Sequence, residues 1–144
     1  MNTAVVQWGI LSTASINEHI ISALRQAPHA ELLAVASRDA VRAAEYTGRH
    51  QIPRAYGTYE ELLADLNIQA VYASLPNRLH AHWTVAALQA GKHVLCEKPL
   101  ARTAEEALKV TQVARATGLV VLEAFMYRFH PPTRRLLSLV MCMQ

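Results

Sequence analysis

Residues 4–16 read AVVQWGILSTASI, and this stretch decides the fold. The apolar run 4–11 has the length and composition of a buried β-strand. Small or hydroxyl residues follow the run: Ser12, Thr13, Ala14 and Ser15. From Ile16 onward the apolar residues take helical spacing, so the stretch predicts a strand, a tight turn and a helix. Such a unit binds the phosphates of dinucleotides, but the turn taken alone fits an ordinary serine-capped turn equally well.

The alternation of strand and helix continues along the chain. Short β-rich apolar runs predict further strands at residues 32–37, 54–56, 70–75, 92–96 and 119–125. Helical segments of about ten to fifteen residues separate them, which indicates βαβ units and a parallel sheet. The sequence therefore predicts an α/β fold, a Rossmann-like doubly wound parallel sheet with its ligand at the carboxyl ends of the strands.

Apolar spacing, capping residues and glycines predict where the helices lie. In the first helix the spacing predicts one buried face, made of Ile16, Ile20, Leu24 and Ala27. Asp39 is a predicted N-cap, and Gly48, Gly91 and Gly118 are predicted to end helices. Two residue pairs have the spacing of capping boxes: Thr58 with Glu61, and Thr103 with Glu106.

The composition limits the kind of protein. The chain has 144 residues and a mass of 16.0 kDa, with 52% hydrophobic and 17% charged residues. That is enough apolar material for the core of one folded domain. No apolar run approaches the roughly 20 residues that cross a bilayer, and the first residues lack a signal-peptide pattern. We therefore expect a cytoplasmic protein with no membrane partner, whose Cys96 and Cys142 are reduced thiols.

The positive charge of the chain comes mainly from arginine. The formal net charge is +3, from eleven arginines and three lysines against eleven acidic residues. Arginine binds phosphate through its planar guanidinium, so a phosphate-bearing ligand is favoured. The basic residues are not interleaved with aromatics, so we expect no nucleic-acid partner. His80 and His82 are two residues apart and do not share a helix face, so no metal site is expected there.

The end of the second predicted strand indicates which dinucleotide is bound. An NAD site carries Asp or Glu there for the ribose 2′-hydroxyl, whereas an NADP site carries cations for the 2′-phosphate. This chain has Ser37 and Arg38 at that point, with Arg42 four residues after Arg38. Two guanidinium groups and a hydroxyl can meet one phosphate, so NADP is predicted and NAD is less favoured. A solvated basic turn is the alternative.

The segment Glu97-Lys98-Pro99 follows the fifth predicted strand. Proline restricts the preceding residue to extended geometry, which holds Lys98 at the tip of the strand. Hydride transfer at a carbon that bears oxygen needs a cation or a proton donor at that oxygen, so Lys98 is a candidate catalytic residue. A solvated lysine is the alternative.

Several blocks of sequence resemble one enzyme family. They are residues 8–14 (WGILSTA), 36–38 (ASR), 76–81 (PNRLHA), 90–101 (AGKHVLCEKPLA) and 123–131 (EAFMYRFHP). The chain resembles the nucleotide-binding half of the glucose-fructose oxidoreductase, inositol dehydrogenase and rhizopine-catabolism oxidoreductase family, from about residue 5 to about residue 137. The Glu-Lys-Pro block is the most specific part. Ser12 and Ala14 depart from the glycines of many members.

The resemblance implies an oxidoreductase that transfers a hydride between NADP(H) and a sugar, polyol or related secondary alcohol or carbonyl. It implies that Lys98 is catalytic and that Lys98 and Arg128 contact the substrate. Together with the strand-end pattern, it assigns a set of residues to cofactor binding: Gly9, Ser12, Thr13, Ala14, Ser15, Ile16, Ser37, Arg38, Arg42, Leu75, Pro76, Asn77, His80, Glu97, Lys98 and Glu123.

The resemblance also divides the chain. Residues 1–124 are the expected dinucleotide-binding domain, and residues 125–144 are the expected start of a truncated α+β substrate domain. The apolar start of that second domain has no visible partner in the sequence, so self-association is expected. A non-catalytic nucleotide-binding module is the alternative function.

Overall fold

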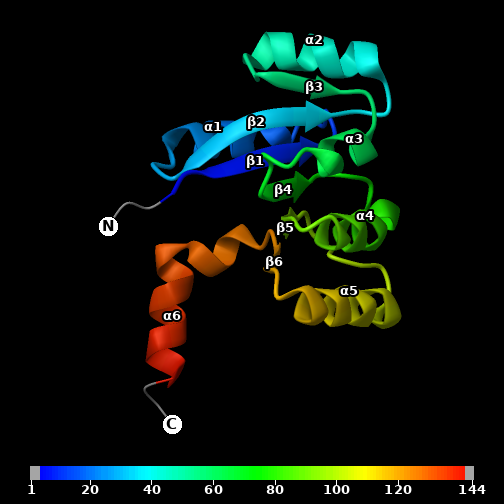
Figure 1. Cartoon of the computed structure of the whole chain (residues 1–144). Coiled ribbons are helices and arrows are strands. Elements are labelled where there is room, and N and C mark those ends of the chain that lie inside the picture. Colours follow the sequence, from blue (N-terminus) through cyan, green and yellow to red (C-terminus); the bar gives the residue numbers. More distant parts are fainter. Residues whose placement is uncertain (1–3, 142–144) are drawn as a thin grey trace.

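The computed structural model describes residues 4–141 of the chain. In chain order the elements are β1 (Val6–Leu11), α1 (Asn17–Gln26), β2 (Ala30–Ala36), α2 (Ala40–His50), β3 (Arg54–Tyr56), α3 (Tyr59–Ala64), β4 (Ala70–Ala73), α4 (Asn77–Gln89), β5 (His93–Cys96), α5 (Ala104–Thr117), β6 (Val121–Glu123), the 3₁₀ helix η1 (Met126–Phe129) and α6 (Pro131–Met141). Strands and helices alternate up to β6 (Figure 1). The predicted α/β fold is confirmed.

The strands of the described chain form one parallel sheet in the order β3-β2-β1-β4-β5-β6. The chain begins in the middle with β1, adds β2 and β3 on one side, and then returns to add β4, β5 and β6 on the other. This is the strand order of doubly wound dinucleotide-binding folds. Because the winding reverses between β1 and β4, the connections that follow these strands diverge and leave a crevice at their carboxyl ends.

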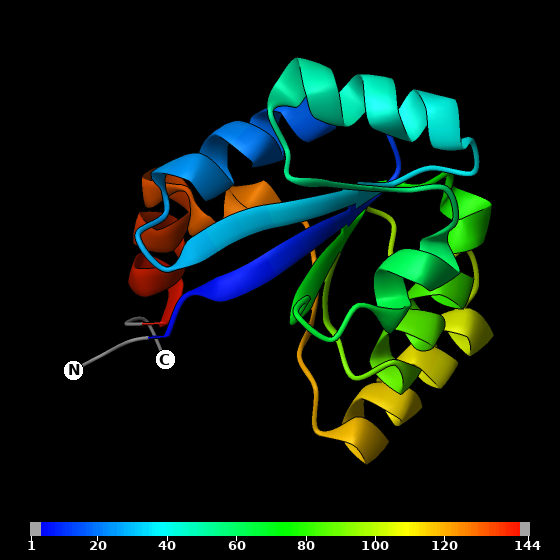
Figure 2. The ribbon, with the colours of Figure 1, turned by 45° about the horizontal axis from the view of Figure 1, so that its top comes forward.

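The helices cover the two faces of the sheet unequally. Figure 2 shows α1 and α2 on one face, with α3, α4 and α5 on the other. The larger core cluster includes Leu11, Leu62 and Cys96, and it lies under α3 to α5. A smaller cluster that includes Ile10 and Tyr72 lies under α1 and α2. On this second face the helices lie toward β1, β2 and β3, so the apolar side chains of β4 to β6 are less covered.

Helix α1 packs on the sheet through a different side than its apolar spacing predicted. Its buried residues are Asn17, Ile21 and Leu24, whereas Ile16 is 39% exposed. The predicted face is therefore confirmed at Leu24 and in part at Ile20, which packs against the smaller core cluster, and it was wrong at Ile16 and Ala27. The Asn17 amide donates to the Ser12 carbonyl in the turn before the helix. Ile16 and Ile20 line a groove together with side chains of β4, β5 and β6.

Several predicted caps are confirmed. The Asp39 carboxylate accepts a hydrogen bond from the Arg42 backbone N–H at 3.1 Å and caps α2. Thr58 and Glu61 form both bonds of a capping box at the start of α3. Gly118 ends α5 with φ of +69°, a backbone conformation that side chains disfavour.

One predicted helix boundary and one predicted capping box are corrected. Helix α2 continues through Gly48 to His50, and Gln51 takes the left-handed conformation with φ of +49° instead. At the start of α5, Thr103 accepts from the Glu106 backbone N–H as predicted. The Glu106 carboxylate, however, accepts from the backbone and the guanidinium of Arg102, which draw it away from the reciprocal bond.

Gly9 is required by packing inside the sheet. It lies within β1 rather than in the turn after it, and a Cβ at this position would approach Leu62 Cδ2 to 2.8 Å and Ile68 Cδ1 to 3.2 Å. Leu62 is fully buried on α3 and has little space to move. The small size of Gly9 therefore admits the α3 side chains to the sheet, and its predicted cofactor contact stays a prediction.

A polar cluster joins α3 to its neighbours at the amino ends of the strands. Asp65 accepts hydrogen bonds from the Arg54 guanidinium at 2.5 Å, the Tyr56 hydroxyl at 2.8 Å and the Asn67 backbone N–H at 2.9 Å. The buried Lys92 ammonium donates to the Asp65 and Ile68 carbonyls at 2.7 and 2.8 Å. These bonds satisfy charged groups that would otherwise be costly to bury.

The segment after β6 leaves the body of the sheet. Helix α6 was not predicted, although Pro131 stands at its first position, where proline is favoured. Large apolar side chains on η1 and α6 are exposed, including Met126 (69%) and Leu136 (61%). The tail beyond Met141, with Cys142, lies outside the described residues. Within residues 4–141, no helix has both the length and the apolarity to cross a membrane.

The two glycines at positions 9 and 48 give a matched stability test. Gly9→Ala forces a Cβ against buried Leu62, and we expect it to lower the free energy of unfolding by about 1–3 kcal/mol. Gly48→Ala meets no atom of the described chain within 4 Å and lies inside helix α2, so it should raise that free energy by roughly 0.5–1 kcal/mol. Urea unfolding measures both changes. Equal stability of the two variants would contradict the packing role of Gly9.

The Asp65 cluster predicts a pH dependence of stability. Burial alone would raise the pKa of Asp65, but the hydrogen bonds from Asn67, Tyr56 and Arg54 outweigh it and hold the pKa well below its usual range. A carboxylate with a depressed folded-state pKa stabilises the fold above its unfolded pKa of about 3.9, and this contribution is lost as the pH falls below that value.

Asp65→Asn should therefore be less stable than the unchanged chain at pH 7, and the difference should shrink between about pH 4 and pH 2. Thermal unfolding across that range measures it. Asp39→Asn keeps an oxygen acceptor for the α2 cap and serves as the control. Parallel stability curves for Asp65→Asn and the unchanged chain would refute the assignment.

Candidate functional site

A polar crevice lies where the carboxyl ends of β1, β2 and β4 meet. It has a volume of about 460 Å³. Its lining comes from the turn after β1, the end of β2 with the start of α2, the start of α3 and the end of β4: Ser12, Thr13, Ala14, Ser37, Arg38, Asp39, Arg42, Tyr59, Ser74 and Pro76. The structure thus brings together most of the residues that the sequence assigned to the two phosphate-binding positions.

In the turn between β1 and α1, a serine takes a backbone conformation that is usual for glycine. Ser12 has φ of +128°, a backbone conformation that glycine adopts far more readily. The Ser12 hydroxyl donates to the Ser74 carbonyl at 2.9 Å and accepts from the Ala14 backbone N–H at 3.2 Å. The small residues Thr13 and Ala14 then lead into α1, whose amino end favours an anion.

The end of β2 presents two cations to the same crevice. Ser37 is buried, and its hydroxyl accepts from the Asp39 backbone N–H at 3.3 Å. Arg38 and Arg42 are exposed and line the crevice from the turn and from α2. The Asp39 carboxylate is engaged in capping α2 through the Arg42 N–H, so it acts as a helix cap.

Tyr59 is a crevice residue that the sequence did not reveal. It is 6% exposed and packs edge-on against Trp83, with ring centroids 4.9 Å apart. Burial raises the pKa of the Tyr59 hydroxyl, while the positive charge of Arg38 lowers it in part. Tyr59 and Arg38 thus line the crevice together. In the sequence, Tyr59 follows the predicted N-cap Thr58, which indicates only that a helix begins there. Nothing in the sequence indicates that this tyrosine lies beside the end of β2.

His80 holds the backbone of two loops. It is 1% exposed, and its ring nitrogens contact the Pro99 carbonyl and the Leu75 carbonyl, both at 2.6 Å. Both ring nitrogens of His80 are therefore occupied inside the protein, and its predicted contact with a cofactor stays a prediction. Leu75 is buried in the core as well, while Asn77 is exposed at the start of α4.

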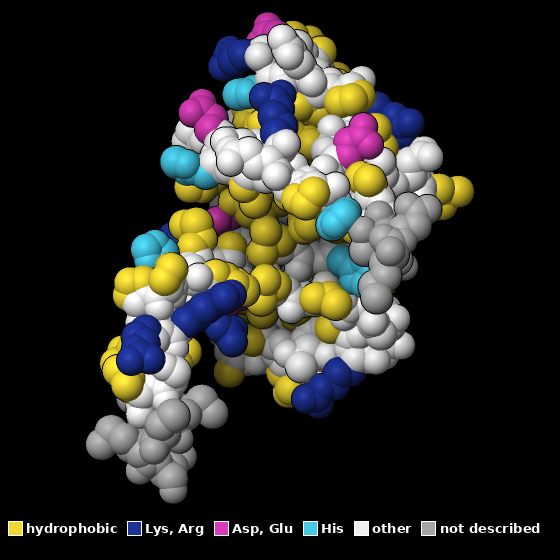
Figure 3. Space-filling model, turned by 90° about the vertical axis from the view of Figure 1, so that its left-hand side faces the viewer, with side chains coloured by type: hydrophobic (Ala, Val, Ile, Leu, Met, Phe, Trp, Pro, Cys, Tyr) yellow, Lys and Arg dark blue, Asp and Glu magenta, His cyan; other side chains and the backbone are white. Residues whose placement is uncertain are grey.

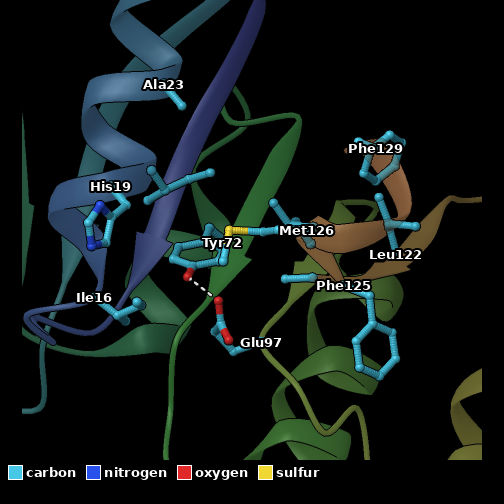
Figure 4. Close-up of a pocket in the computed structure, with 12 residues that line it drawn as sticks. Ile16, His19, Ala23, Tyr72, Glu97, Leu122, Phe125, Met126 and Phe129 are labelled. Atoms are coloured by element: carbon cyan, nitrogen blue, oxygen red, sulfur yellow. Dashed lines mark hydrogen bonds between the residues drawn. The ribbon is translucent and has the colours of Figure 1, made fainter. Parts of the chain in front are cut away.

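Lys98 is exposed directly after β5, as the sequence predicts. The Glu97 carboxylate before it accepts from the Tyr72 hydroxyl at 2.7 Å and from the Lys98 backbone N–H at 3.3 Å. Figure 4 shows the first of these bonds at the floor of a pocket. Burial and the Glu97 carboxylate raise the pKa of Tyr72, so this tyrosine stays protonated and fixes Glu97.

The remaining predicted residues lie around this edge of the sheet. The Glu123 carboxylate accepts from the Leu100 backbone N–H at 2.8 Å and braces the loop that follows Lys98. Arg128 is exposed on η1. Ser15 lines a small polar hollow between α1 and α2 rather than the main crevice. Cys96 is fully buried, and burial raises its pKa to about 11, so it is an inert core thiol as predicted.

An apolar groove of about 300 Å³ adjoins this edge on the α1 face of the sheet. Figure 4 shows Ile16, His19 and Ala23 of α1 on one side, with Leu122, Phe125, Met126 and Phe129 on the other. Tyr72 and Glu97 lie between the two sides. Figure 3 shows apolar side chains gathered in a hollow of this surface. The groove is the uncovered part of the sheet face described above.

The strand order, the crevice and the Glu97-Lys98-Pro99 segment define the class of protein. The sequence pattern of the oxidoreductase family with an NAD-binding Rossmann fold, the Gfo/Idh/MocA family, matches residues 6–125. The chain belongs to this family. It comprises the family's nucleotide-binding domain, as the resemblance predicted.

Among curated relatives, the chain is 48% identical over 135 residues to a D-xylose 1-dehydrogenase (NADP(+)) of Haloferax volcanii, covering 94% of this chain and 42% of the relative. It is 37% identical over 137 residues to the human trans-1,2-dihydrobenzene-1,2-diol dehydrogenase, with 94% and 41% covered. The chain therefore spans about two-fifths of the length of these relatives.

Among solved structures, the chain is similar to a 3-ketoreductase from Actinomadura kijaniata in complex with NADP. The sequences are 37% identical, the TM-score is 0.87, and the match covers 94% of this chain and 44% of that one. The match extends past β6, so the Rossmann-like sheet of this chain has the same arrangement as the sheet of that enzyme.

Proposed function

We propose that the chain binds NADP(H) in the crevice and forms the nucleotide-binding part of an oxidoreductase for a sugar, a polyol or a related secondary alcohol or carbonyl. The observation that carries the proposal is the end of β2, where Ser37, Arg38 and Arg42 line the same crevice. The D-xylose dehydrogenase and the 3-ketoreductase that resemble this chain are both described with NADP, which supports the same cofactor here.

The residues present fit a 2′-phosphorylated dinucleotide. An NAD site needs a free carboxylate after β2 for the ribose hydroxyl, but the nearest carboxylate, that of Asp39, is engaged in the α2 cap. The two guanidinium groups offer charge-assisted hydrogen bonds to a phosphate. Ser12, Thr13 and Ala14 would hold the pyrophosphate against the amino end of α1.

The reacting end of the cofactor would lie toward the ends of β4 and β5. Bound NADP(H) supplies or accepts the hydride. Asn77 is exposed at the start of α4 and can hold the nicotinamide half, while Glu97 is fixed by Tyr72 and orients the segment that carries Lys98. The Lys98 ammonium would donate to the substrate oxygen, where charge develops during hydride transfer. Arg128 would contact the substrate from η1.

The substrate, the second domain and the location are further parts of the proposal. The apolar groove and the exposed side chains of η1 and α6 support the view that residues from 125 onward begin a substrate domain. The same exposed surface supports self-association of the isolated chain. We keep the cytoplasmic location that the sequence predicts.

The cofactor preference is tested by titrating NADPH and NADH into the chain. We expect NADPH to bind more tightly, and Arg38→Ala to weaken NADPH binding more than tenfold, because a hydrogen bond to a charged group contributes about 1.5–3 kcal/mol. NADH binding should change little. Arg102→Ala removes an exposed arginine paired with Glu106 on α5 and should leave both affinities unchanged. Equal affinities of the unchanged chain for the two cofactors would refute the proposal.

The role of Lys98 is tested in a chimaera that joins this chain to the C-terminal part of the Haloferax volcanii D-xylose dehydrogenase. Lys98→Met should reduce turnover by roughly a hundredfold or more, the scale of losing a positioned donor. NADPH affinity should stay within about tenfold, and Tm within a few degrees, because an exposed lysine contributes little to stability. Parental turnover would show that Lys98 is not catalytic.

A further inference from the structure

Three polar side chains meet under the crevice and come from three different elements. Ser12 follows β1, Asn17 begins α1, and Ser74 follows β4. The Ser12 and Ser74 hydroxyls are 2.8 Å apart, and the Ser74 hydroxyl donates to Asn17 Oδ1 at 2.5 Å. The Asn17 amide NH₂ donates in turn to the Ser12 carbonyl at 3.0 Å, which closes a ring of hydrogen bonds. We call this ring the serine–asparagine cluster.

The cluster is placed where the turn needs support. The backbone of Ser12 is in a conformation that strains any residue except glycine. The Ser12 hydroxyl donates to the Ser74 carbonyl, and the Ser12 carbonyl accepts from the Asn17 amide. These hydrogen bonds stabilise the strained conformation. The contacts of the Ser12 hydroxyl with Ser74 are ones that a glycine could not make.

The Asn17 amide makes hydrogen bonds on both sides of the cluster, to Ser12 and to Ser74. It is fully buried on the sheet-facing side of α1, a position that an apolar residue would fill with less desolvation cost. Both polar atoms of its amide are directed to the turn and to the end of β4. Asn17 does not line the crevice, so it acts on a ligand there through Ser12 and Ser74.

We propose that Asn17 and Ser74 are positioning residues for the cofactor: through the ring of hydrogen bonds at Ser12, they fix the turn that holds the pyrophosphate. This inference rests on the proposed function and deepens it. Because β1 and β4 are neighbours in the sheet, the cluster also fastens the two sides of the crevice to each other. The phosphate-binding turn is then rigid before the cofactor arrives, so little ordering is needed on binding.

The first experiment measures amide hydrogen exchange of Thr13 and Ala14 without cofactor. Asn17→Ala and Ser74→Ala should each speed this exchange about tenfold or more, and Ser74→Thr, which keeps a hydroxyl, should restore it. Ser12→Ala should be more damaging than Ser12→Gly, since alanine keeps the strained conformation and loses the hydroxyl. Thr47→Ala removes a buried hydroxyl that donates to the Ala44 carbonyl within α2, and it should leave the exchange unchanged.

The second experiment titrates NADPH into the same variants. Asn17→Ala should weaken binding about fivefold to tenfold although Asn17 lies outside the crevice lining, and Thr47→Ala should not weaken it. Unchanged exchange and unchanged NADPH affinity in both Asn17→Ala and Ser74→Ala would overturn the inference. If the unchanged chain has a protected turn but does not bind NADPH, the proposed function fails while the structural role of the cluster stands.

Discussion

The structure depends on the pairing of β1 with β4 in the middle of a parallel sheet. β4 is buried throughout and β1 from Gly9 onward, and the two strands run side by side from Trp8 and Ala70 to Leu11 and Ala73. Because the chain winds outward from this pair in both directions, the connections after β1 and β4 separate and leave room at the carboxyl ends. This reversal of the winding direction places the crevice, together with the turn at Ser12 and the arginines after β2 that line it.

The same winding accounts for the apolar groove. The first half of the chain puts α1 and α2 on one face and the second half puts α4 and α5 on the other, so each face has a half that its own helices do not cover. On the α4 and α5 face, α3 covers the other half through Leu62, which Gly9 admits to the sheet. On the α1 and α2 face, Ile16 and Tyr72 remain beside the apolar groove.

The sequence predicted the strands, their parallel arrangement and the residues after each strand, because these depend on local patterns. It failed where three-dimensional contacts decide. Asn17 is buried on α1 by its hydrogen bond to the preceding turn, and Ile16 is exposed although the apolar spacing favoured it. The place of His80 after β4 gave no sign that its ring nitrogens contact the Leu75 and Pro99 carbonyls.

The most direct test of the account is to map where NADP⁺ binds on the chain. In a titration followed by backbone amide chemical shifts, the changes should concentrate in residues 12–16, 37–42 and 74–77, which surround the crevice. The amides of 110–121, on α5 and the outer edge of the sheet, should not move. Shifts that centred on the apolar groove beside η1, or an absence of shifts at millimolar NADP⁺, would contradict the account.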